Sequence, residues 1–337
     1  MMRNEHRMAI IPRTAATRAI LILIVSIAVP MSPGCSISPR PAGSSAAPTT
    51  LTVVTLNIRH DNPGDGPDAW PRRADELVAA LDGFDADVIG LQEVLPGQAD
   101  RIADDLPGFA MLVRSRDRTA GRGEAVPILW RTSAWRLDPD AHGTFWLSET
   151  PDVPGSKSWD SSLPRIVTWA RLLPTSMHPR QDERRPFWVF NAHFDHRGKA
   201  ARFESASLLV ARILDWCDPD EPVVLMGDLN ARPGEPPILH LDRGTSTAPG
   251  LIDCWASLNP TTVEDATWNG FEVVETGPRI DYVFARGLAV RSADIERPLT
   301  AEGRPISDHW PVRVVLEAVG AVRTDQASAV IRSRPPM

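Results

Sequence analysis

The stretch VVLMGDLNARPGEP, residues 223–236, ends an apolar run on polar residues that suit chemistry. Gly227 is followed by Asp228 and Asn230, and two prolines and a glycine then break the pattern. Asp, Asn and Gly suit an ordinary turn whatever the function. Polar groups at the carboxyl end of a buried strand are also where α/β proteins place their chemistry. Partner residues at other strand ends would therefore favour a site over a turn.

Partner residues are present at the edges of other apolar runs. They carry carboxylate, amide or imidazole groups: Asn57, Glu93, Asn191, His193, Asp195, Asp281, Asp308 and His309. Buried ionised groups are costly unless they are paired or bind a metal, and oxygen ligands suit Mg²⁺ or Mn²⁺ rather than zinc. A hard dication beside imidazoles and amides is typical of a phosphate site. The set indicates hydrolysis of a phosphoester, in which Asp228 activates a water and His309 or His193 stabilises the phosphate charge.

These side chains require a framework of alternating strands and helices. Apolar runs predict strands over residues 51–58, 87–94, 126–131, 143–147, 166–173, 186–194, 222–226, 279–285 and 311–316. Helical spacing predicts helices over residues 72–81 and 199–216. No repeat of fixed period is visible, so a solenoid or a propeller is excluded. We expect one α/β domain over residues 51–319, in which two sheets are covered by helices.

The ordered motifs LNIRH, LQEV, NAHFDH, GDLN, RIDYVF and SDHWPV resemble the endonuclease/exonuclease/phosphatase superfamily over about residues 51–316. The resemblance implies a two-sheet α/β sandwich of the deoxyribonuclease I type, with a metal site at the edge where the two sheets meet. It implies that Glu93 is the principal ligand of Mg²⁺, with Mn²⁺ as the other suitable ion. Asn57 would lie beside Glu93, and Asp308 would be a further carboxylate on the metal side.

The same resemblance implies roles for five catalytic residues. Asp228 would orient or deprotonate the attacking water, and Asn230 would help to hold the water and the phosphate. His309 would contact the phosphate and would be oriented by Asp281. His193 lies where many family members have a second histidine, whereas repair endonucleases commonly have tyrosine there.

Further polar residues at loop or strand ends are candidates for holding substrate, such as a second phosphate or a sugar hydroxyl. They are Arg59, Arg165, Asn191, Asp195, His196 and Arg197, with His60 beside the first of them. Each has an ordinary alternative role as a turn or capping residue.

Several functions compete with a metal-dependent phosphodiesterase or phosphatase. A nuclease, either a DNA endonuclease or a deadenylase-like RNA exonuclease, needs the same residues. The net charge of −7 and the absence of a basic stripe argue only against a sequence-independent DNA binder. A dinuclear metallophosphatase would need a later Asn-His-Asp motif and more histidines. A non-enzymatic, lipid-tethered binding domain on a decayed scaffold would have lost some of the catalytic residues, and all are present. We expect a monomer that acts on a small or lipid-like phosphoester, with nucleic acid as the alternative substrate.

The N-terminal segment predicts export. Arginines precede an apolar run over residues 19–29, which is too short to span a membrane but suits a signal peptide over residues 1–35. Gly34 and Cys35 resemble the end of a bacterial lipobox, although the two residues before them depart from it. The protein is therefore expected in the cell envelope, either tethered by lipid on Cys35 or periplasmic or secreted after ordinary cleavage. Residues 36–50 predict a flexible linker, and residues 320–337 a disordered tail.

Two further cysteines, Cys217 and Cys254, each lie next to a tryptophan in an apolar context. Export makes a disulfide between them possible. Two buried free thiols are the alternative that this context favours equally.

Overall fold

The structure, a computed structural model, describes residues 9–10, 50–119, 121–176, 184–245, 248–259 and 265–318. The predicted signal peptide, the linker and the tail lie outside these residues, apart from Ala9–Ile10 and Thr50. Within the described part of the chain, no helix has both the length and the apolar character needed to cross a bilayer.

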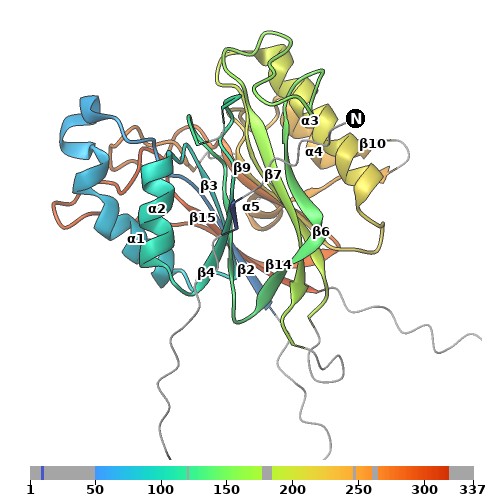
Figure 1. The fold of residues 1–337 in the computed structure, drawn as a ribbon, viewed down its shortest axis with the longest axis horizontal. Helices are drawn as coiled ribbons and strands as arrows, with labels where there is room; N and C mark the ends of the chain where they lie inside the picture. The colour runs from blue at the N-terminus through green and yellow to red at the C-terminus, as the bar shows by residue number, and fades with distance from the viewer. Residues whose placement is uncertain are drawn as a thin grey trace, which may run out of the picture.

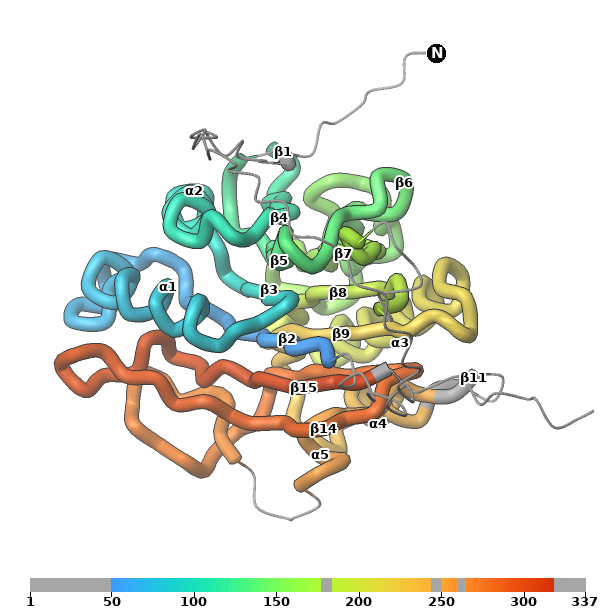
Figure 2. The backbone as a smooth tube through the Cα atoms, turned by 90° about the horizontal axis from the view of Figure 1, so that it is seen from below, coloured from blue at the N-terminus to red at the C-terminus, as the bar shows by residue number. Residues whose placement is uncertain are grey.

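Two β-sheets face each other, and helices cover the outer surface of each one (Figure 1). The larger sheet has seven strands in the order β1-β4-β5-β3-β2-β15-β14. Its strands are β1 (Ala9–Ile10), β2 (Thr50–Asn57), β3 (Val88–Gln92), β4 (Phe109–Val113), β5 (Ile128–Arg131), β14 (Leu288–Ile295) and β15 (Val312–Ala318). Figure 2 shows the first of the long strands, β2, directly beside the last, β15.

The smaller sheet has six strands in the order β12-β13-β9-β8-β7-β6. Its strands are β6 (Trp135–Trp146), β7 (Ile166–Pro174), β8 (Phe187–His193), β9 (Val223–Asp228), β12 (Ile252–Asp253) and β13 (Asp281–Arg286). A separate ribbon pairs β10 (Gly244–Thr245) with β11 (Ala248–Pro249). The observed fold is therefore a two-sheet α/β sandwich, as the resemblance of the motifs implied.

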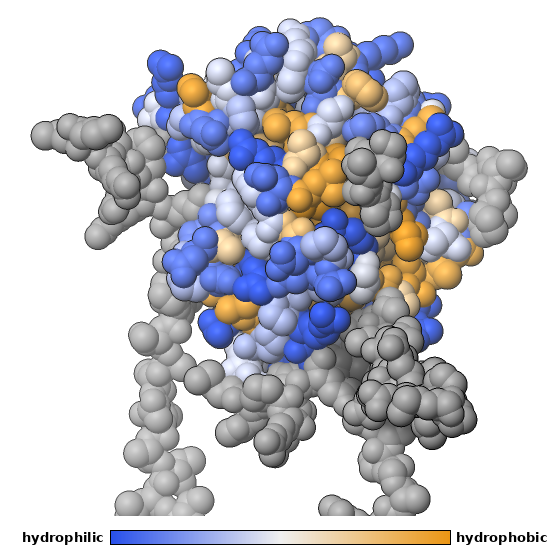
Figure 3. Space-filling view, turned by 90° about the vertical axis from the view of Figure 1, so that its right-hand side faces the viewer, coloured by the Kyte–Doolittle hydropathy of each residue, from blue (hydrophilic) through white to orange (hydrophobic). Residues whose placement is uncertain are grey.

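The helices cover opposite sides of the sandwich. Helices α1 (Ala74–Gly83) and α2 (Pro96–Asp105) cover the seven-stranded sheet, and α3 (Lys199–Trp216) and α4 (Pro236–Arg243) cover the six-stranded sheet (Figure 1). Helix α5 (Cys254–Leu258) and the 3₁₀ turns Pro63–Asp68 and Trp70–Arg72 complete the elements. On the side of the molecule that carries α3 and α4, mostly hydrophilic residues surround a central group of hydrophobic ones (Figure 3).

Strands buried on both faces explain the long apolar runs of the sequence. In β2, Val53 packs between the two sheets, whereas Val54 packs against the helical layer of α1 and α2. In β8, Val189 lies between the sheets and Phe190 packs under α3. The core therefore has three layers, one between the sheets and one beneath each pair of helices.

The predicted strands and helices agree with the structure to within a few residues, but several elements were missed. These are the helices α2, α4 and α5, the strands β1, β4, β10, β11, β12 and β14, and the first half of β6. Helix α4 begins at Pro236, one of the prolines expected to break the structure, and α2 begins at Pro96. Proline is well tolerated in the first turn of a helix, because the N–H that it lacks has no partner there.

Asn191 joins the two sheets. Its Nδ2 donates to the carbonyl oxygens of Leu91 and Pro127, both at 2.8 Å, and its Oδ1 accepts a hydrogen bond from Gln92 Nε2 at 2.7 Å. The side chain is fully buried. Asn191, expected as a substrate-binding residue, is thus placed inside the core with its polar atoms already used, and this position corrects the expectation.

The two cysteines of the domain are free thiols. Cys217 lies in the layer beneath α3, whereas Cys254 lies in the layer between the sheets. Burial raises the pKa of the Cys217 thiol to about 12 and also raises that of Cys254. The structure therefore supports the alternative of two buried, unreactive cysteines.

Candidate active site

Strand ends from both sheets meet around one pocket of about 530 Å³. The predicted site residues that line this pocket are Glu93, Arg165, His193, His196, Asp228, Asn230, Asp308 and His309, together with His60. Asn57 ends β2 and Asp281 begins β13, and both contact lining residues. The pocket thus lies at the edge where the two sheets meet, as the fold predicts.

The register of three neighbouring strands brings three polar side chains together. β8 and β9 run parallel with His193 opposite Asp228, and β13 runs antiparallel to β9 with Asp281 opposite Asp228. Directly paired residues of adjacent strands present their side chains on the same face. Gly227 allows this pairing, because its φ is +140° and a Cβ there would lie 1.9 Å from the carbonyl oxygen of Ala192.

On the other side of the pocket, Asn57 and Glu93 form a cluster of oxygen ligands. Asn57 Nδ2 donates to Glu93 Oε1 at 3.2 Å and to Asp228 Oδ2 at 3.0 Å. His60 Nδ1 lies 2.8 Å from Glu93 Oε2. Burial opposes ionisation of Glu93, but its hydrogen bonds with His60 and Asn57 outweigh burial and hold the pKa of Glu93 well below its usual range. Glu93 is therefore ionised at neutral pH.

The carboxylate of Asp308 has few hydrogen-bond or charge partners among the described residues. Its contacts among the described residues are Ser307 Oγ at 3.4 Å and Arg59 Nε at 4.0 Å. Burial, and next the charge of Glu93, raise its pKa against the opposing effects of His309 and Arg59. A buried carboxylate next to a second one is stabilised by a cation. The donor set of Glu93, Asp308 and Asn57 therefore fits a hard divalent metal ion.

Backbone strain is concentrated at this site. Arg59, Glu93 and Asn230 have positive φ angles of 55°, 60° and 49°. Non-glycine residues with positive φ are uncommon, and such strain clusters at functional sites because the surrounding structure holds it in place. Each of the three lies one or two residues beyond the end of a strand.

Asp281 and His309 form a buried pair. His309 Nδ1 lies 2.8 Å from Asp281 Oδ2. Burial alone would lower the pKa of His309, but the charge of Asp281 and its hydrogen bond raise that pKa to about 10. His309 is therefore an imidazolium ion at neutral pH, with its Nε2 3.9 Å from Asp228 Oδ2.

Asp228 is poised between its two protonation states. Burial, and then the charge of Asp281, raise its pKa to about 7, although His309 and the hydrogen bond from Asn57 oppose this. Asp228 Oδ1 accepts a hydrogen bond from the backbone N–H of Asn230 at 2.9 Å. A carboxylate with a pKa near neutrality is suited to general base catalysis.

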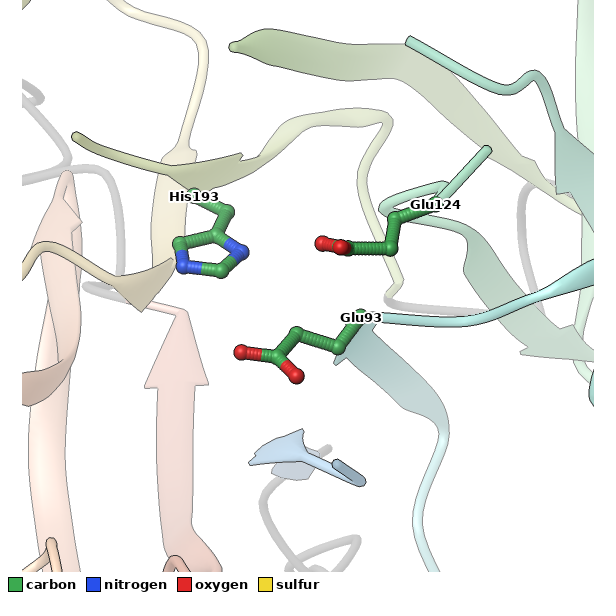
Figure 4. Close-up of side chains that lie close together, drawn as sticks. All are labelled: Glu93, Glu124 and His193. Atoms are coloured by element: carbon green, nitrogen blue, oxygen red, sulfur yellow. The ribbon is translucent and has the colours of Figure 1, made fainter. Parts of the chain in front are cut away.

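His193 is buried and neutral. Its Nε2 lies 3.4 Å from Asp228 Oδ2, and burial together with the nearby Arg165 holds its pKa well below the usual value. Figure 4 shows the carboxylates of Glu93 and Glu124 pointing toward His193, and ligand atoms of the three lie within 4.8 Å of one another. However, Arg116 donates to both carboxylate oxygens of Glu124, at 2.7 and 2.8 Å. A cation among these three residues would have to compete with that guanidinium.

Three other predicted substrate residues are placed differently. Asp195 accepts backbone hydrogen bonds from Ser162 at 2.9 Å and from Gly198 at 2.7 Å, and it does not line the pocket. Arg197 is exposed and is also outside the lining. Arg59 pairs with Asp65 through two hydrogen bonds of 2.9 Å. Asp195 thus organises a loop, because its oxygens are used by that loop.

Sequence reasoning missed several residues of the pocket wall: Arg116, Glu124, Leu163, Arg232, Glu235 and Trp268. Glu124 directly precedes an apolar run, so the signal used for the strand ends was also present at this strand start. Trp268 carried no such signal, because a tryptophan usually belongs to the core. It is 45% exposed, and its backbone forms an isolated β-bridge with His309.

Comparisons with known proteins agree with this geometry. A family model described as "Endonuclease/Exonuclease/phosphatase family" matches residues 54–309. The solved endonuclease/exonuclease/phosphatase from Bacteroides vulgatus is 28% identical, with a TM-score of 0.71 over 80% of this chain and 100% of that chain. A mannosyl-6-phosphatase from Bacteroides thetaiotaomicron is 31% identical, with a TM-score of 0.66 over 79% of this chain and 99% of that one. An uncharacterised protein of Acanthamoeba polyphaga mimivirus is 27% identical over 169 residues, which are 48% of this chain and 59% of that protein. The match thus spans less than two thirds of that viral relative.

Proposed function

The chain belongs to the endonuclease/exonuclease/phosphatase family, whose members are hydrolases that act on phosphoesters, and we propose that it is a metal-dependent hydrolase of a small phosphoester. The observation that carries this proposal is that two groups of polar residues meet at one pocket. Asp228 and His309, the latter paired with Asp281, form one group in the pocket wall, and the oxygen ligands Glu93 and Asp308 form the other.

The metal-side residues are suited to Mg²⁺, with Mn²⁺ as an alternative. Glu93, Asn57 and Asp308 would hold the ion, which when bound neutralises charge on a phosphoryl oxygen. Because Asn57 also reaches Asp228 at 3.0 Å, it links the metal side to the catalytic carboxylate.

The catalytic residues each have a separate role in the reaction. Asp228 accepts a proton from the attacking water, whose oxygen forms a bond to phosphorus as the bond to the leaving oxygen breaks. The departing alkoxide takes a proton from solvent water and leaves as the alcohol. His309, kept protonated by Asp281, donates a hydrogen bond to a phosphoryl oxygen that gains charge. His193, held neutral by burial, donates to the phosphate without adding charge. Asn230 fixes the Asp228 carboxylate through its backbone N–H.

A small, ring-bearing alcohol is the leaving group that the pocket supports best. One relative, at 31% identity, is a mannosyl-6-phosphatase. In this chain the half-exposed Trp268 offers an aromatic face at the pocket wall, next to His309 in the backbone pairing. Aromatic faces bind the apolar side of rings while leaving polar edges free. We therefore propose a sugar phosphate ahead of a lipid-like or nucleic acid substrate.

A substrate panel with metal control tests this function. The purified protein is assayed on a sugar 6-phosphate, 4-nitrophenyl phosphate, bis(4-nitrophenyl) phosphate, sphingomyelin, plasmid DNA and polyadenylate. We expect hydrolysis of small esters that is abolished by EDTA and restored by Mg²⁺ or Mn²⁺. Full activity in excess EDTA, with no metal found by mass spectrometry, would contradict the metal requirement. Rapid cleavage of DNA or polyadenylate, with inert small esters, would assign a nuclease instead.

A further inference from the structure

Arg165 is a buried cation in the pocket wall, and most of its N–H donors have no hydrogen-bond partner among the described residues. Arg165 is only 4% exposed, and neither its Nε nor its Nη1 makes a hydrogen bond to any described residue. Its Nη2 lies 3.1 Å from His196 Nδ1, and its Nε lies 3.8 Å from Asp195 Oδ2. A buried guanidinium without hydrogen bonds is costly, so such a group requires an explanation.

The surroundings of Arg165 place it at the phosphate-binding end of the pocket. It lines the main pocket together with His193, and both residues also line a smaller cavity of about 10 Å³. The second guanidinium in that wall, Arg116, is bonded to Glu124 on both oxygens. Arg165 has no comparable carboxylate, since Asp195 Oδ2 already accepts a hydrogen bond of 2.6 Å from Ser162 Oγ.

We propose that Arg165 binds a non-bridging oxygen of a terminal phosphoryl group and thereby makes the enzyme select phosphate monoesters over diesters. This inference rests on the proposed phosphoester hydrolysis and adds the class of ester. A free guanidinium beside His193 is matched by a phosphate oxygen, because Arg donors form paired, charge-assisted hydrogen bonds with phosphate.

Phosphate monoesters and diesters differ in charge. A monoester carries about −1.5 to −2 charges at pH 7, and a diester only −1. A monoester has three non-bridging oxygens, whereas in a diester the third position carries a substituent. The cavity of about 10 Å³ next to Arg165 has room for about one water-sized group, whereas the main pocket of about 530 Å³, which Arg165 also lines, has room for the rest of the ester. The charge at Arg165 therefore favours the monoester.

The test compares two esters that share a leaving group. The full chain is assayed with 4-nitrophenyl phosphate and with bis(4-nitrophenyl) phosphate, as wild type, Arg165→Met and Arg165→Lys. We expect kcat/KM for the monoester to fall at least about tenfold in Arg165→Met, the loss typical of a charged hydrogen bond. The diester value should change less than threefold, and Arg165→Lys should lie between, because it keeps the charge but not the paired donors.

A control arginine lies on β7, the strand that begins directly after Arg165. Arg171, six residues further on β7, pairs with Asp138 and Glu221 away from the pocket. Arg171→Met should leave the monoester-to-diester ratio unchanged. Because the only partners of Arg165 among the described residues are Asp195 Oδ2 at 3.8 Å and His196 Nδ1 at 3.1 Å, Arg165→Met should lower Tm only slightly. A parallel fall of both kcat/KM values, or a wild type that prefers the diester, would overturn the inference.

A binding experiment that needs no turnover distinguishes this inference from the proposed function. Inorganic phosphate, but not dimethyl phosphate, should raise the Tm of the wild type, and Arg165→Met should lose this protection. If the wild type hydrolyses neither ester but phosphate protects it through Arg165, the proposed function fails and the phosphate subsite stands. If the wild type is an active hydrolase that phosphate neither inhibits nor protects, the subsite fails and the function stands. Should Arg165→Met not fold, Arg165→Lys and the wild-type ester ratio decide.

Discussion

At the scale of single residues, the proposed chemistry depends most directly on Asp228. Asp228→Asn keeps the size of the side chain and the turn but removes the base. We expect kcat to fall by about 10²–10⁴, the contribution typical of general acid–base catalysis. The measurement is kcat/KM of wild type and variant at saturating Mg²⁺. A folded variant within about threefold of wild type, or ~0.65 kcal/mol of activation free energy, would return the GDLN stretch to the status of a simple turn.

The same substitution should stabilise the metal-free protein at alkaline pH. The folded-state pKa of Asp228 is raised from 3.8 to about 7, so the protonated carboxyl is favoured on folding. The resulting stability is fully present below about pH 3.8 and is lost as the pH rises through about 7. In EDTA at pH 8, Asp228→Asn should therefore have a Tm about 3 °C or more above wild type. The gain should shrink at pH 5, and a gain that is the same at both pH values would contradict the assigned cause.

Asp281 is expected to act through His309 as a positioning residue. Asp281→Asn removes the charge that raises the pKa of His309 to about 10, so this pKa should fall toward the ordinary value near 6.5. The alkaline limb of the kcat–pH profile should move down by at least about one pH unit, because the imidazolium is lost earlier. A purely structural role would lower kcat at every pH and leave the limb in place. His309→Gln is the control, since it should abolish that limb.

The residue types of the site could be predicted from the sequence, but part of the pocket wall could not. Glu93, Asp228 and His309 follow or precede apolar runs, and strand ends are recognisable from hydrophobicity alone. Trp268 reaches the pocket through a backbone bridge to His309, so its position depends on tertiary geometry, whereas Glu124 directly precedes an apolar run and carried the same signal as the strand ends. Asn191 shows the converse error, because a polar residue on a buried strand also serves to join sheets.

At the scale of elements, the parallel pairing of β8 and β9 depends on one glycine. Gly227→Ala introduces a Cβ 1.9 Å from the carbonyl oxygen of Ala192 and imposes a strained φ. We expect the free energy of unfolding to fall by about 2 kcal/mol or more, from strain and overpacking together. Denaturant unfolding measures this loss, and activity should fall with it because His193 and Asp228 are paired there.

Two other glycines separate the causes of that loss. Gly303 has a φ of +76° and nothing near its Cβ position, so Gly303→Ala should cost about 1 kcal/mol from strain alone. Gly97, in α2, has neither a positive φ nor a close neighbour, so Gly97→Ala should be neutral or stabilising by about 1 kcal/mol or less. Equal losses in all three variants would show that the close contact at Gly227 is not the cause.

Two physical reasons explain why α2, α4 and β14 were missed. α2 and α4 begin with prolines, and proline signals a helix start as well as a break. β14, with a bulge between Val290 and Ser292, is an edge strand that is only partly buried, so its apolar run is short. α3 was predictable because it is 18 residues long, so its helical spacing extends over several turns.

At the scale of the whole molecule, we propose that the domain is exported and that Cys35 is the acylated first residue of the mature chain. The short apolar run before Gly34 supports this proposal. Intact-mass analysis of the native protein should find a chain that begins at Cys35 with added lipid, and Cys35→Ala should release the protein from the membrane fraction. A mature chain without lipid that begins at another residue would instead support ordinary secretory cleavage.

β2 and β15 are neighbours in the sheet, but β2 is synthesised near the beginning of the domain and β15 at its end. β15 lies between β2 and β14, and Ser307 Oγ donates to the Asn57 carbonyl across 250 residues of chain. Until residues 312–318 have left the ribosome, β2 has an open edge, and Asp308 and His309 have no fixed place. Non-local pairing of this kind forms slowly. A nascent chain therefore keeps one edge of β2 unpaired and the site incomplete until almost all of the domain has been synthesised, so it is catalytically silent until then.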